Sequence, residues 1–309
     1  MKVLILLSTY NGEKYLHEQM DSLLKQEGVD VSVLVRDDGS KDKTVTILKE
    51  YEAKHHNVEV EYGHNVGCAD CFRWLLNAAY NRIRDYDYFA FSDQDDVWLP
   101  EKVKVACSIL SKTDSTKPSM YCSNVCAVDS ELNKINMKWK PNETLLSKEQ
   151  SLVWSMSYGC TMLFNRKVIE LFHSCPPEKL VLHDLWVMHM CFFFGDVYYD
   201  NHSYILYRQH GDNVVGAKTT FISRMRCHWK SLQHLFSQHY NEQEAQVMLK
   251  AYDGMLTPED KALVGIVANY RKDFSIRIKW LFGLGKNYRA ISRKQDNIWL
   301  KMRILLGKV

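Results

Sequence analysis

The sequence predicts an α/β fold, with a mostly parallel sheet flanked by helices and a helical extension at the C-terminal end. Three observations predict it. Short apolar runs alternate with helical patterns through residues 1–100. Three of these runs lead directly into polar loops rich in Asp, Ser and Thr. Residues 220–309 show mostly amphipathic helical patterns instead. Alternation of strand and helix is the pattern of parallel sheets with helices on their faces.

The apolar runs of residues 1–100 have the length and composition of buried strands. The predicted strands are residues 3–7, 31–35, 58–61 and 88–91, and the predicted helices are residues 15–24, 71–82 and a segment that ends near 51. In sheets of this kind, ligands bind outside the carboxyl ends of the strands. We therefore expect the polar loops after residues 7, 35 and 91 to converge on one ligand site.

Beyond residue 100 the alternation is looser. We expect helices at 102–110, 167–172 and 184–194, strands at 120–128 and 159–164, and mostly helices over 220–309. No apolar run is long enough for a transmembrane helix. We therefore expect one α/β domain at 1–216 and a helical, basic region at 217–309.

The net charge of +3 is unevenly distributed along the chain. Residues 270–309 contain 11 Lys or Arg and 2 Asp, a net charge of +9, which leaves −6 for the rest. Basic residues interleaved with Trp, Leu and Ile are typical of helices that lie in a membrane interface. We therefore predict peripheral membrane contact through 270–309. The negative charge of the remainder disfavours broad contact with nucleic acid.

Nine cysteines at irregular spacing, with no secretory signal before them, favour reduced thiols in the cytoplasm. Cys68-x-x-Cys71 together with Cys122-x-x-x-Cys126 allows a zinc site as an alternative. Small buried thiols are the preferred interpretation, because the first pair falls where a helix starts and the second within a predicted strand.

Three carboxylates gather directly after the predicted strand 88–91. Asp93, Asp95 and Asp96 repel one another at neutral pH unless a cation neutralises them. A hard divalent ion with oxygen ligands does this and keeps positions open for a diphosphate. Such an ion stabilises a departing nucleoside diphosphate as a Lewis acid. The alternative is a solvated acidic turn, but the position of these carboxylates directly after a strand favours a metal site.

Two further loops carry groups that suit a nucleotide. Thr9, Tyr10 and Asn11 follow the first strand and offer hydroxyls and a ring face. Asp37 and Asp38 follow the second strand, where one carboxylate can accept a hydrogen bond from a base and the other can cap the next helix. Taken alone, the first loop is only a polar loop, and the second is better explained as a plain turn. Their shared position at strand ends favours a nucleotide site.

Two later segments offer candidates for catalysis and phosphate binding. Asp184 opens a predicted helix, where it acts either as a cap that complements the helix dipole or as a general base on an acceptor hydroxyl. Arg208 can pair with phosphate, and His210 can bind metal or phosphate. A surface loop explains residues 207–213 equally well, and spacing does not choose between these interpretations.

In their order and spacing, these motifs resemble the family 2 glycosyltransferases. The motifs are Ser8-Thr9-Tyr10-Asn11-Gly12, Arg36-Asp37-Asp38-Gly39-Ser40, Asn65-x-Gly67, Phe91-Ser92-Asp93-Gln94-Asp95-Asp96-Val97-Trp98-Leu99-Pro100 and Gly159-Cys160-Thr161-Met162. His183-Asp184-x-Trp186 and Tyr207-Arg208-Gln209-His210 are similar to a bacterial rhamnosyltransferase-like branch. The resemblance covers residues 1–216 and leaves 217–309 unassigned.

The resemblance implies a GT-A fold, which is a Rossmann-like nucleotide-binding α/β domain, and an inverting single displacement. It implies that Thr9, Tyr10 and Asp38 line the nucleoside pocket and that Asp184 is the catalytic base. The full set of expected nucleotide-sugar residues is Thr9, Tyr10, Asn11, Asp38, Asn65, Gly67, Asp93 and Arg208. The expected ligands of Mg2+ or Mn2+ are Asp95, Asp93, Asp96 and His210.

The expected reaction transfers one sugar, rhamnose or another hexose, from a nucleoside-diphosphate sugar to a hydroxyl of a saccharide or lipid-linked acceptor. Such a reaction belongs to the synthesis of cell-surface polysaccharide. The tail lacks the Gln-x-x-Arg-Trp motif of processive synthases, which favours one sugar per reaction. We expect a cytoplasmic protein, held peripherally at the inner face of the membrane, with no nucleic-acid partner.

Two other functions remain open from the sequence. A metal-dependent nucleotidyltransferase also combines a nucleotide fold with an acidic metal site. The chain has no Gly-rich phosphate loop with Lys or Arg after the first strand, which counts against it. The other function, of a different class, is a non-catalytic membrane- or nucleic-acid-binding protein that acts through its basic tail.

Overall fold

The computed structural model describes residues 1–135, 146–153, 157–210, 239–282 and 294–307. The chain divides into two compact units, each of which is described by itself. The first unit comprises Met1–Asn136, Ser157–Pro176 and His183–Gln209, and the second comprises Met137–Met156, Pro177–Leu182 and His210–Val309. The predicted domain boundary at 216 lies outside the described residues.

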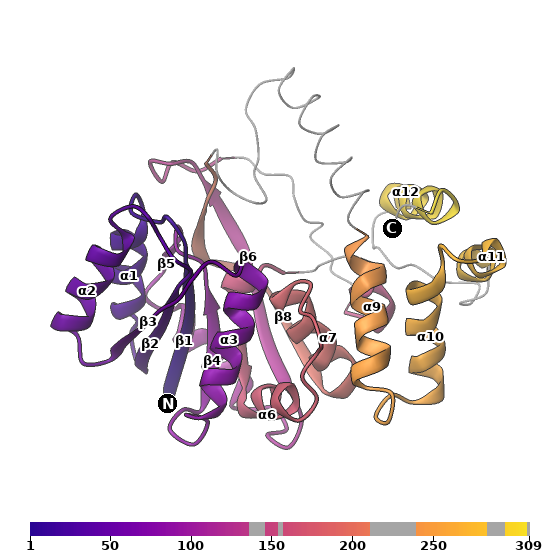
Figure 1. Ribbon diagram of the computed structural model, residues 1–309, viewed down its shortest axis with the longest axis horizontal. Helices are drawn as coiled ribbons and strands as arrows, with labels where there is room; N and C mark the ends of the chain where they lie inside the picture. The colour runs from indigo at the N-terminus through magenta and orange to yellow at the C-terminus, as the bar shows by residue number, and fades with distance from the viewer. Residues whose placement is uncertain (136–145, 154–156, 211–238, 283–293, 308–309) are drawn as a thin grey trace. The chain divides into compact units, whose positions relative to one another are not determined.

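The first unit is built on one mixed sheet (Figure 1). In the part of the chain that the structure describes, its strand order is β3-β2-β1-β4-β7-β6-β8-β5. The strands are β1 Lys2–Thr9, β2 Asp30–Asp37, β3 Val58–Tyr62, β4 Tyr88–Ser92, β5 Val97–Trp98, β6 Ser119–Val128, β7 Leu163–Asn165 and β8 Asp196–Arg208. The first four strands are parallel, as is the pair β6 and β8, while β7 and β5 pair antiparallel with their neighbours. The prediction of a mostly parallel sheet is confirmed.

Strand β1 forms the centre of the core and fixes the register of the site. Its apolar run Val3–Leu7 is buried between β2 and β4. The register sets Thr9 opposite Asp37 and Leu7 opposite Ser92. From β1 the chain adds β2 and β3 on one side and β4 on the other. Ligands of open α/β sheets bind at such a reversal of strand order, here beyond the ends of β1 and β4.

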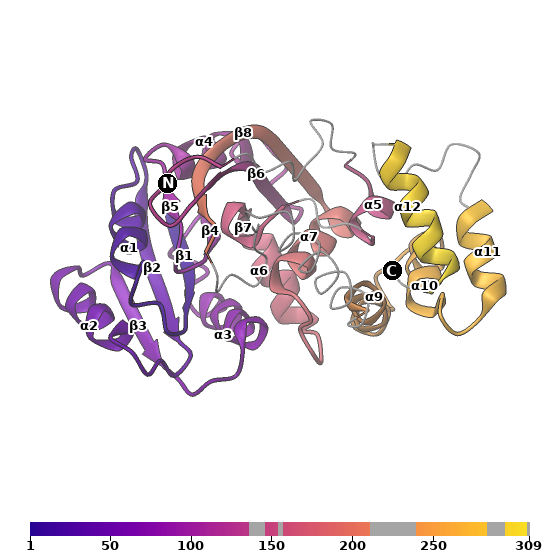
Figure 2. The same cartoon turned by 90° about the horizontal axis from the view of Figure 1, so that it is seen from above.

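Helices cover this sheet. Each has apolar residues that recur at helical spacing and are buried against the sheet. The helices are α1 Leu16–Leu24, α2 Thr44–Lys54, α3 Cys68–Tyr80, α4 Lys102–Leu110, α6 Arg166–Ser174 and α7 His183–Phe194. In α3, Cys71, Leu75 and Ala79 recur at helical spacing and are fully buried, and the helix lies along β1 in Figures 1 and 2. The helices predicted at 102–110, 167–172 and 184–194 match α4, α6 and α7 to within two residues.

One predicted strand, at 159–164, has a different structure. Gly159–Thr161 forms a 3-10 turn, and only Leu163–Asn165 pairs as β7. The turn arises because Gly159 packs directly under the start of α7. A Cβ at this position would lie 2.7 Å from Nε2 of His183. Apolar composition predicted a strand here, while close packing against α7 produces a turn.

The second unit is helical in its described residues. It contains α5 Lys148–Ser151, α9 Tyr240–Ala251, α10 Pro258–Asn269, α11 Phe274–Phe282 and α12 Lys294–Leu305. Thr257 caps α10 by accepting a hydrogen bond from the backbone N–H of Asp260, and Pro258 occupies the first turn. Asp260 in turn binds Nζ of Lys148 at 2.8 Å. Within the described residues, no helix has both the length and the hydropathy needed to cross a bilayer.

Candidate functional site

The acidic loop comprises residues 93–96 and begins where β4 ends. Asp96 is fully buried, and its Oδ1 accepts a hydrogen bond from the backbone N–H of Arg208 at 3.0 Å. Burial, together with the carboxylates of Asp95 and Asp184, raises the pKa of Asp93 to about 7. Burial and the carboxylates of Asp95 and Asp93 raise the pKa of Asp96 well above its usual range. Asp93 and Asp96 therefore hold their protons more tightly than an isolated carboxyl does, because burial and the neighbouring carboxylates disfavour the ionised form.

The donor atoms of this loop suit a divalent cation. Among the residues that the structure describes, one group has metal-ligand atoms within 4.8 Å of one another, namely Asp93, Asp96 and Cys160. Oδ2 of Asp96 is buried with no hydrogen-bond partner. Carboxylate oxygens are the preferred ligands of Mg2+ and Mn2+, and the orphaned oxygen is a donor that a cation would satisfy. The two carboxylates therefore fit the expected ion.

The loop after β1 is joined to the acidic loop by Gln94. Its Oε1 accepts from the N–H of Tyr10 at 2.8 Å, and its Nε2 donates to the carbonyl of Tyr10 at 3.1 Å. A Cβ at Gly12 would lie 2.3 Å from Gln94 Oε1, so the amide needs a glycine beneath it. The ring of Tyr10 is 42% exposed, and it can offer its face to a base.

Thr9 and Asn11 serve the loop itself. Thr9 is buried, and its hydroxyl donates to Oδ1 of Asp37 at 3.2 Å. Asn11 has a positive φ of 49°, and its Oδ1 accepts from the N–H of Lys41 at 2.8 Å. Asp37 also accepts from the N–H groups of Gly39 and Ser40, at 3.1 and 2.9 Å. These bonds hold the ends of β1 and β2 in one fixed arrangement.

Asp38 organises the segment that leads into α3. Its carboxylate accepts from the N–H of Val66 at 3.0 Å and from the N–H of Gly67 at 2.8 Å. It is also paired with the guanidinium of Arg36 at 2.5 Å. Gly67 has a φ of +88°, which favours glycine. The predicted residues Asn65 and Gly67 therefore lie beside Asp38, with the backbone of Asn65 close against Gly39.

Asp184 lies in the first turn of α7, where its Oδ1 accepts from the N–H of Leu185 at 2.8 Å. Its charge reaches Asp93, as the raised pKa of that residue shows. The thiol of Cys68, at the start of α3, is within electrostatic reach of the same carboxylates. Burial, followed by the carboxylates of Asp93 and Asp184, raises the pKa of this thiol, and Asp38 adds a smaller effect.

Arg208 ends β8 and is 1% exposed, with its guanidinium bonded within the protein. Arg208 therefore lies in the protein interior against the acidic loop, with its Nε on the backbone carbonyl of Asp95. His210 belongs to the second unit, so its expected role as a metal ligand stays a prediction.

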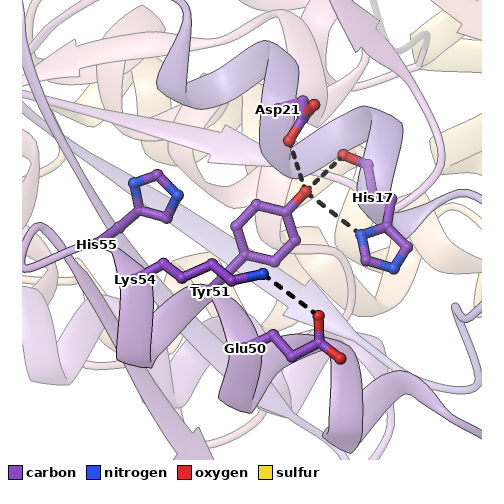
Figure 3. A pocket seen from close by; sticks show the side chains of 6 residues that line it. All are labelled: His17, Asp21, Glu50, Tyr51, Lys54 and His55. Carbon is purple, nitrogen blue, oxygen red and sulfur yellow. Dashed lines mark hydrogen bonds and ion pairs between the residues drawn. The ribbon is translucent and has the colours of Figure 1, made fainter.

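A shallow pocket of about 150 Å³ lies between α1 and α2. Figure 3 shows the hydroxyl of Tyr51 close to the carboxylate of Asp21, at 2.6 Å, and to the backbone carbonyl and ring Nδ1 of His17, at 3.1 and 3.4 Å. The other lining residues are Glu50, Lys54 and His55. None of the predicted site residues lines this pocket.

Sequence reasoning missed four residues that shape the site, namely Glu18, Gln94, Cys160 and His183. Gln94 and Cys160 stood inside recognised motifs without an assigned task, and His183 stood beside Asp184. Nothing in the local pattern marked Glu18, because its partner Arg208 is 190 residues away. Among the residues that the structure describes, the eight cysteines are not joined in disulfides, and Cys68/Cys71 and Cys122/Cys126 form no metal cluster.

Comparison with known proteins places these features in a family. A dTDP-rhamnosyl transferase of Shigella flexneri, RfbG, is 28% identical over 237 residues, which cover 71% of this chain and 77% of that protein. The structure of Staphylococcus aureus TarS 1–349 in complex with UDP-GlcNAc superposes with a TM-score of 0.59 at 17% identity, covering 99% of this chain and 82% of that one.

A mannosyltransferase of Pyrobaculum calidifontis, PcManGT, in complex with GDP-Man and Mn2+, gives a TM-score of 0.52 at 14% identity, with 99% and 85% of the chains covered. These two structural matches confirm the GT-A-like fold. The sequence model of the family described as Glycosyl transferase family 2 matches residues 4–172, which is more than half of the sequence. The chain therefore belongs to glycosyl transferase family 2.

Proposed function

We propose that this glycosyltransferase transfers one sugar, with inversion, from a nucleoside-diphosphate sugar to a hydroxyl of a saccharide or lipid-linked acceptor. The observation that carries the proposal is the acidic loop after β4, where ligand atoms of Asp93 and Asp96 lie within 4.8 Å of one another and Gln94 ties the loop to Tyr10 after β1. Asp184 opens α7 within electrostatic reach of Asp93. A nucleoside site, a phosphate site and a base suit a displacement at one sugar carbon.

The nucleoside end of the donor is proposed to lie over the β1 and β2 loops. The exposed ring of Tyr10 stacks on the base, while Thr9 and Asn11 hold the loop that carries it. Asp38 holds the backbone of residues 66–67 through two hydrogen bonds. Together with Asn65 and Gly67, it is proposed to line one side of the nucleoside pocket. Since Gln94 joins Tyr10 to the acidic loop, nucleoside and phosphate contacts are held in one geometry.

Asp95, Asp93 and Asp96 would hold Mg2+ or Mn2+ at the diphosphate. The bound ion would supply Lewis-acid stabilisation of the departing diphosphate. The protein's own contribution is to hold several carboxylates close together. Their mutual repulsion and burial disfavour the ionised form, which raises the pKa of Asp93. His210 remains a proposed further ligand.

Asp184 is proposed as the base that takes the proton from the acceptor hydroxyl. Its carboxylate stands at the first turn of α7 and within electrostatic reach of Asp93. When the acceptor oxygen attacks the sugar carbon, its proton passes to Asp184, and the bond to the diphosphate breaks on the opposite face. The base and the leaving group thus act from opposite sides of the sugar.

The sugar is proposed to be rhamnose or another hexose. RfbG of Shigella flexneri is described as a dTDP-rhamnosyl transferase, while TarS was crystallised with UDP-GlcNAc and PcManGT with GDP-Man. A thermal-shift panel of dTDP-, UDP- and GDP-sugars with Mn2+ tests this choice. A donor that binds the folded chain raises its Tm by mass action. If no nucleotide sugar raises the Tm at millimolar concentration, the proposed donor class is wrong.

Membrane contact is proposed through α12. Ile298, Met302 and Leu305 recur at helical spacing and are exposed, while Leu300 and Ile304 are buried. The helix therefore has an outward apolar stripe within a segment of net charge +9. An anionic bilayer fits both features. A peripheral position at the inner membrane face would bring the site to lipid-linked acceptors.

Flotation of the full chain with anionic phospholipid vesicles tests this surface. We expect Ile298→Glu combined with Met302→Glu to abolish flotation. Met255→Glu is the matched control, because Met255 is equally exposed in the same unit but lies outside α12. Unchanged flotation of the double variant would contradict the assignment.

The nucleotidyltransferase and the non-catalytic protein are both disfavoured by membership in a glycosyltransferase family. The released product separates the first of them directly. A sugar transfer releases a nucleoside diphosphate, whereas a nucleotidyl transfer releases pyrophosphate.

A further inference from the structure

The guanidinium of Arg208 connects three separate parts of the first unit. Its Nε donates to the backbone carbonyl of Asp95 at 2.8 Å, and its Nη1 donates to the carbonyl of Ser130 at 2.6 Å. Its Nη2 donates to the carboxylate of Glu18. The backbone N–H of Arg208 also binds Asp96. One residue at the end of β8 therefore holds both the backbone and a side chain of the acidic loop.

Helix α1 supplies the surroundings that make this buried cation stable. The guanidinium carbon lies 4.3 Å from the centroid of the Tyr15 ring, and Glu18 follows one helical turn later. A buried guanidinium loses hydration and needs a counter-charge and hydrogen-bond acceptors. Tyr15 offers its ring face, and Glu18 offers the charge. The start of α1 is thus complementary to Arg208.

This ion pair differs from the solvated pairs on the surface. The side chain of Arg208 is 1% exposed and that of Glu18 is 55% exposed, whereas both members of Lys25–Asp21 and Lys54–Glu50 are more than half exposed. Solvent screening makes fully exposed pairs weak, and here the guanidinium is not exposed to it. The buried guanidinium therefore transmits the position of Glu18 to the backbone of Asp95 through its own hydrogen bonds.

Resting on the proposed function, we propose that Glu18 is a positioning residue that acts through Arg208. It holds the guanidinium against the carbonyl of Asp95 and thereby fixes the acidic loop for a divalent cation and a diphosphate. Arg208 then influences the phosphates through Asp95 rather than by direct contact. Neither residue touches the reacting sugar carbon, so their effect appears first in cation binding.

Mn2+ binding to the full chain, followed by electron paramagnetic resonance of the free ion, tests the proposal without a sugar donor. Loss of a group that orients a metal ligand typically weakens affinity by about 10–100-fold. We expect at least a ten-fold loss for Glu18→Ala and a smaller loss for Glu18→Gln, which keeps an acceptor for Arg208. Glu50→Ala is the matched control, because Glu50 is a similarly exposed helical carboxylate in an ion pair.

A purely structural role would lower the Tm of Glu18→Ala without changing its Mn2+ affinity, and that result would overturn the proposal. Arg208→Lys provides a second test, since lysine keeps the charge but lacks the planar fork whose three nitrogens each hold a different partner. We expect Glu18→Ala to cause little further loss in the Arg208→Lys background, because the two act as one unit. Fully additive losses, or no Mn2+ binding by the unmodified chain, would also contradict it. Failure of the donor panel with these results intact would refute only the proposed function.

Discussion

The imidazole of His183 is stacked on the ring of Phe72, with 3.7 Å between the ring centroids and 16° between the planes. Its edge meets Phe91, with centroids 4.8 Å apart. Phe72 belongs to α3, Phe91 precedes the acidic loop in β4, and His183 precedes Asp184. The stack therefore fixes the proposed base relative to the proposed phosphate site.

Replacing His183 separates positioning from stability. We expect His183→Phe to retain the stack and most of the activity, because an aromatic ring still fills the space. His183→Ala removes the ring and should destabilise the fold by about 3 kcal/mol. It should also lower kcat more than KM, since the base is displaced while donor binding persists. Steady-state kinetics below the Tm of each variant check this, and an unchanged kcat in His183→Ala would count against the role.

The same residue makes stability depend on pH. Burial lowers the pKa of His183 to about 4, below its value of about 6.5 in an unfolded chain. Between these values the unfolded state binds more protons. The free energy of unfolding should therefore fall as the pH drops from about 6.5 to about 4, with no contribution from this group above that window. Tm values near pH 7.5 and pH 5 should show a smaller acid loss in His183→Phe, and equal losses would speak against this cause.

Gly159 leaves room for the same imidazole. A methyl group there would lie 2.7 Å from Nε2 of His183 and 3.3 Å from Cβ of Asp184. Overpacking of this kind costs about 1–3 kcal/mol, so Gly159→Ala should lower both the Tm and kcat. Gly265→Ala is the control, because a Cβ at Gly265 meets nothing within 4 Å. Wild-type kinetics in Gly159→Ala would show that this contact does not hold the base.

Cys68 offers a chemical probe of the site. Part of the residue is exposed, while burial of its sulfur, followed by the carboxylates of Asp93 and Asp184, raises the pKa of the thiol. We expect N-ethylmaleimide to label it slowly, because the thiolate is the reactive form. A donor with Mn2+ should protect it. Peptide mass spectrometry locates the label, with Cys68→Ser as the control, and labelling at an undiminished rate with bound donor would place the donor elsewhere.

The sequence predicted the parts of the fold that depend on local pattern. The apolar run Val3–Leu7 and the alternation that follows it were sufficient to predict a parallel sheet and the edge where its loops meet. The carboxylates after those strands were found because strand ends converge in such sheets. The 3-10 turn at Gly159 was missed, because its cause is the ring of His183, which belongs to a distant helix.

The supporting contacts could not be predicted from one sequence. Glu18 and Arg208 meet across 190 positions, and Gln94 and Tyr10 meet across 84. Neither pair follows any period of helix or strand. Arg208 was expected at phosphate because guanidinium groups pair with phosphate in general. Its observed partners depend on where β8 ends relative to α1, which only the folded chain determines.

The release of nucleoside diphosphate by Asp184→Asn, with the donor that stabilises the chain, a hydroxyl acceptor and Mn2+, tests the central claim most directly. Asparagine keeps the size of the side chain but cannot take a proton. A general base contributes at least about 100-fold, so transfer should fall by that factor or more while the Tm and donor binding stay near those of the unmodified chain. Full transfer activity in a folded Asp184→Asn would contradict the assignment of the base and with it the proposed mechanism.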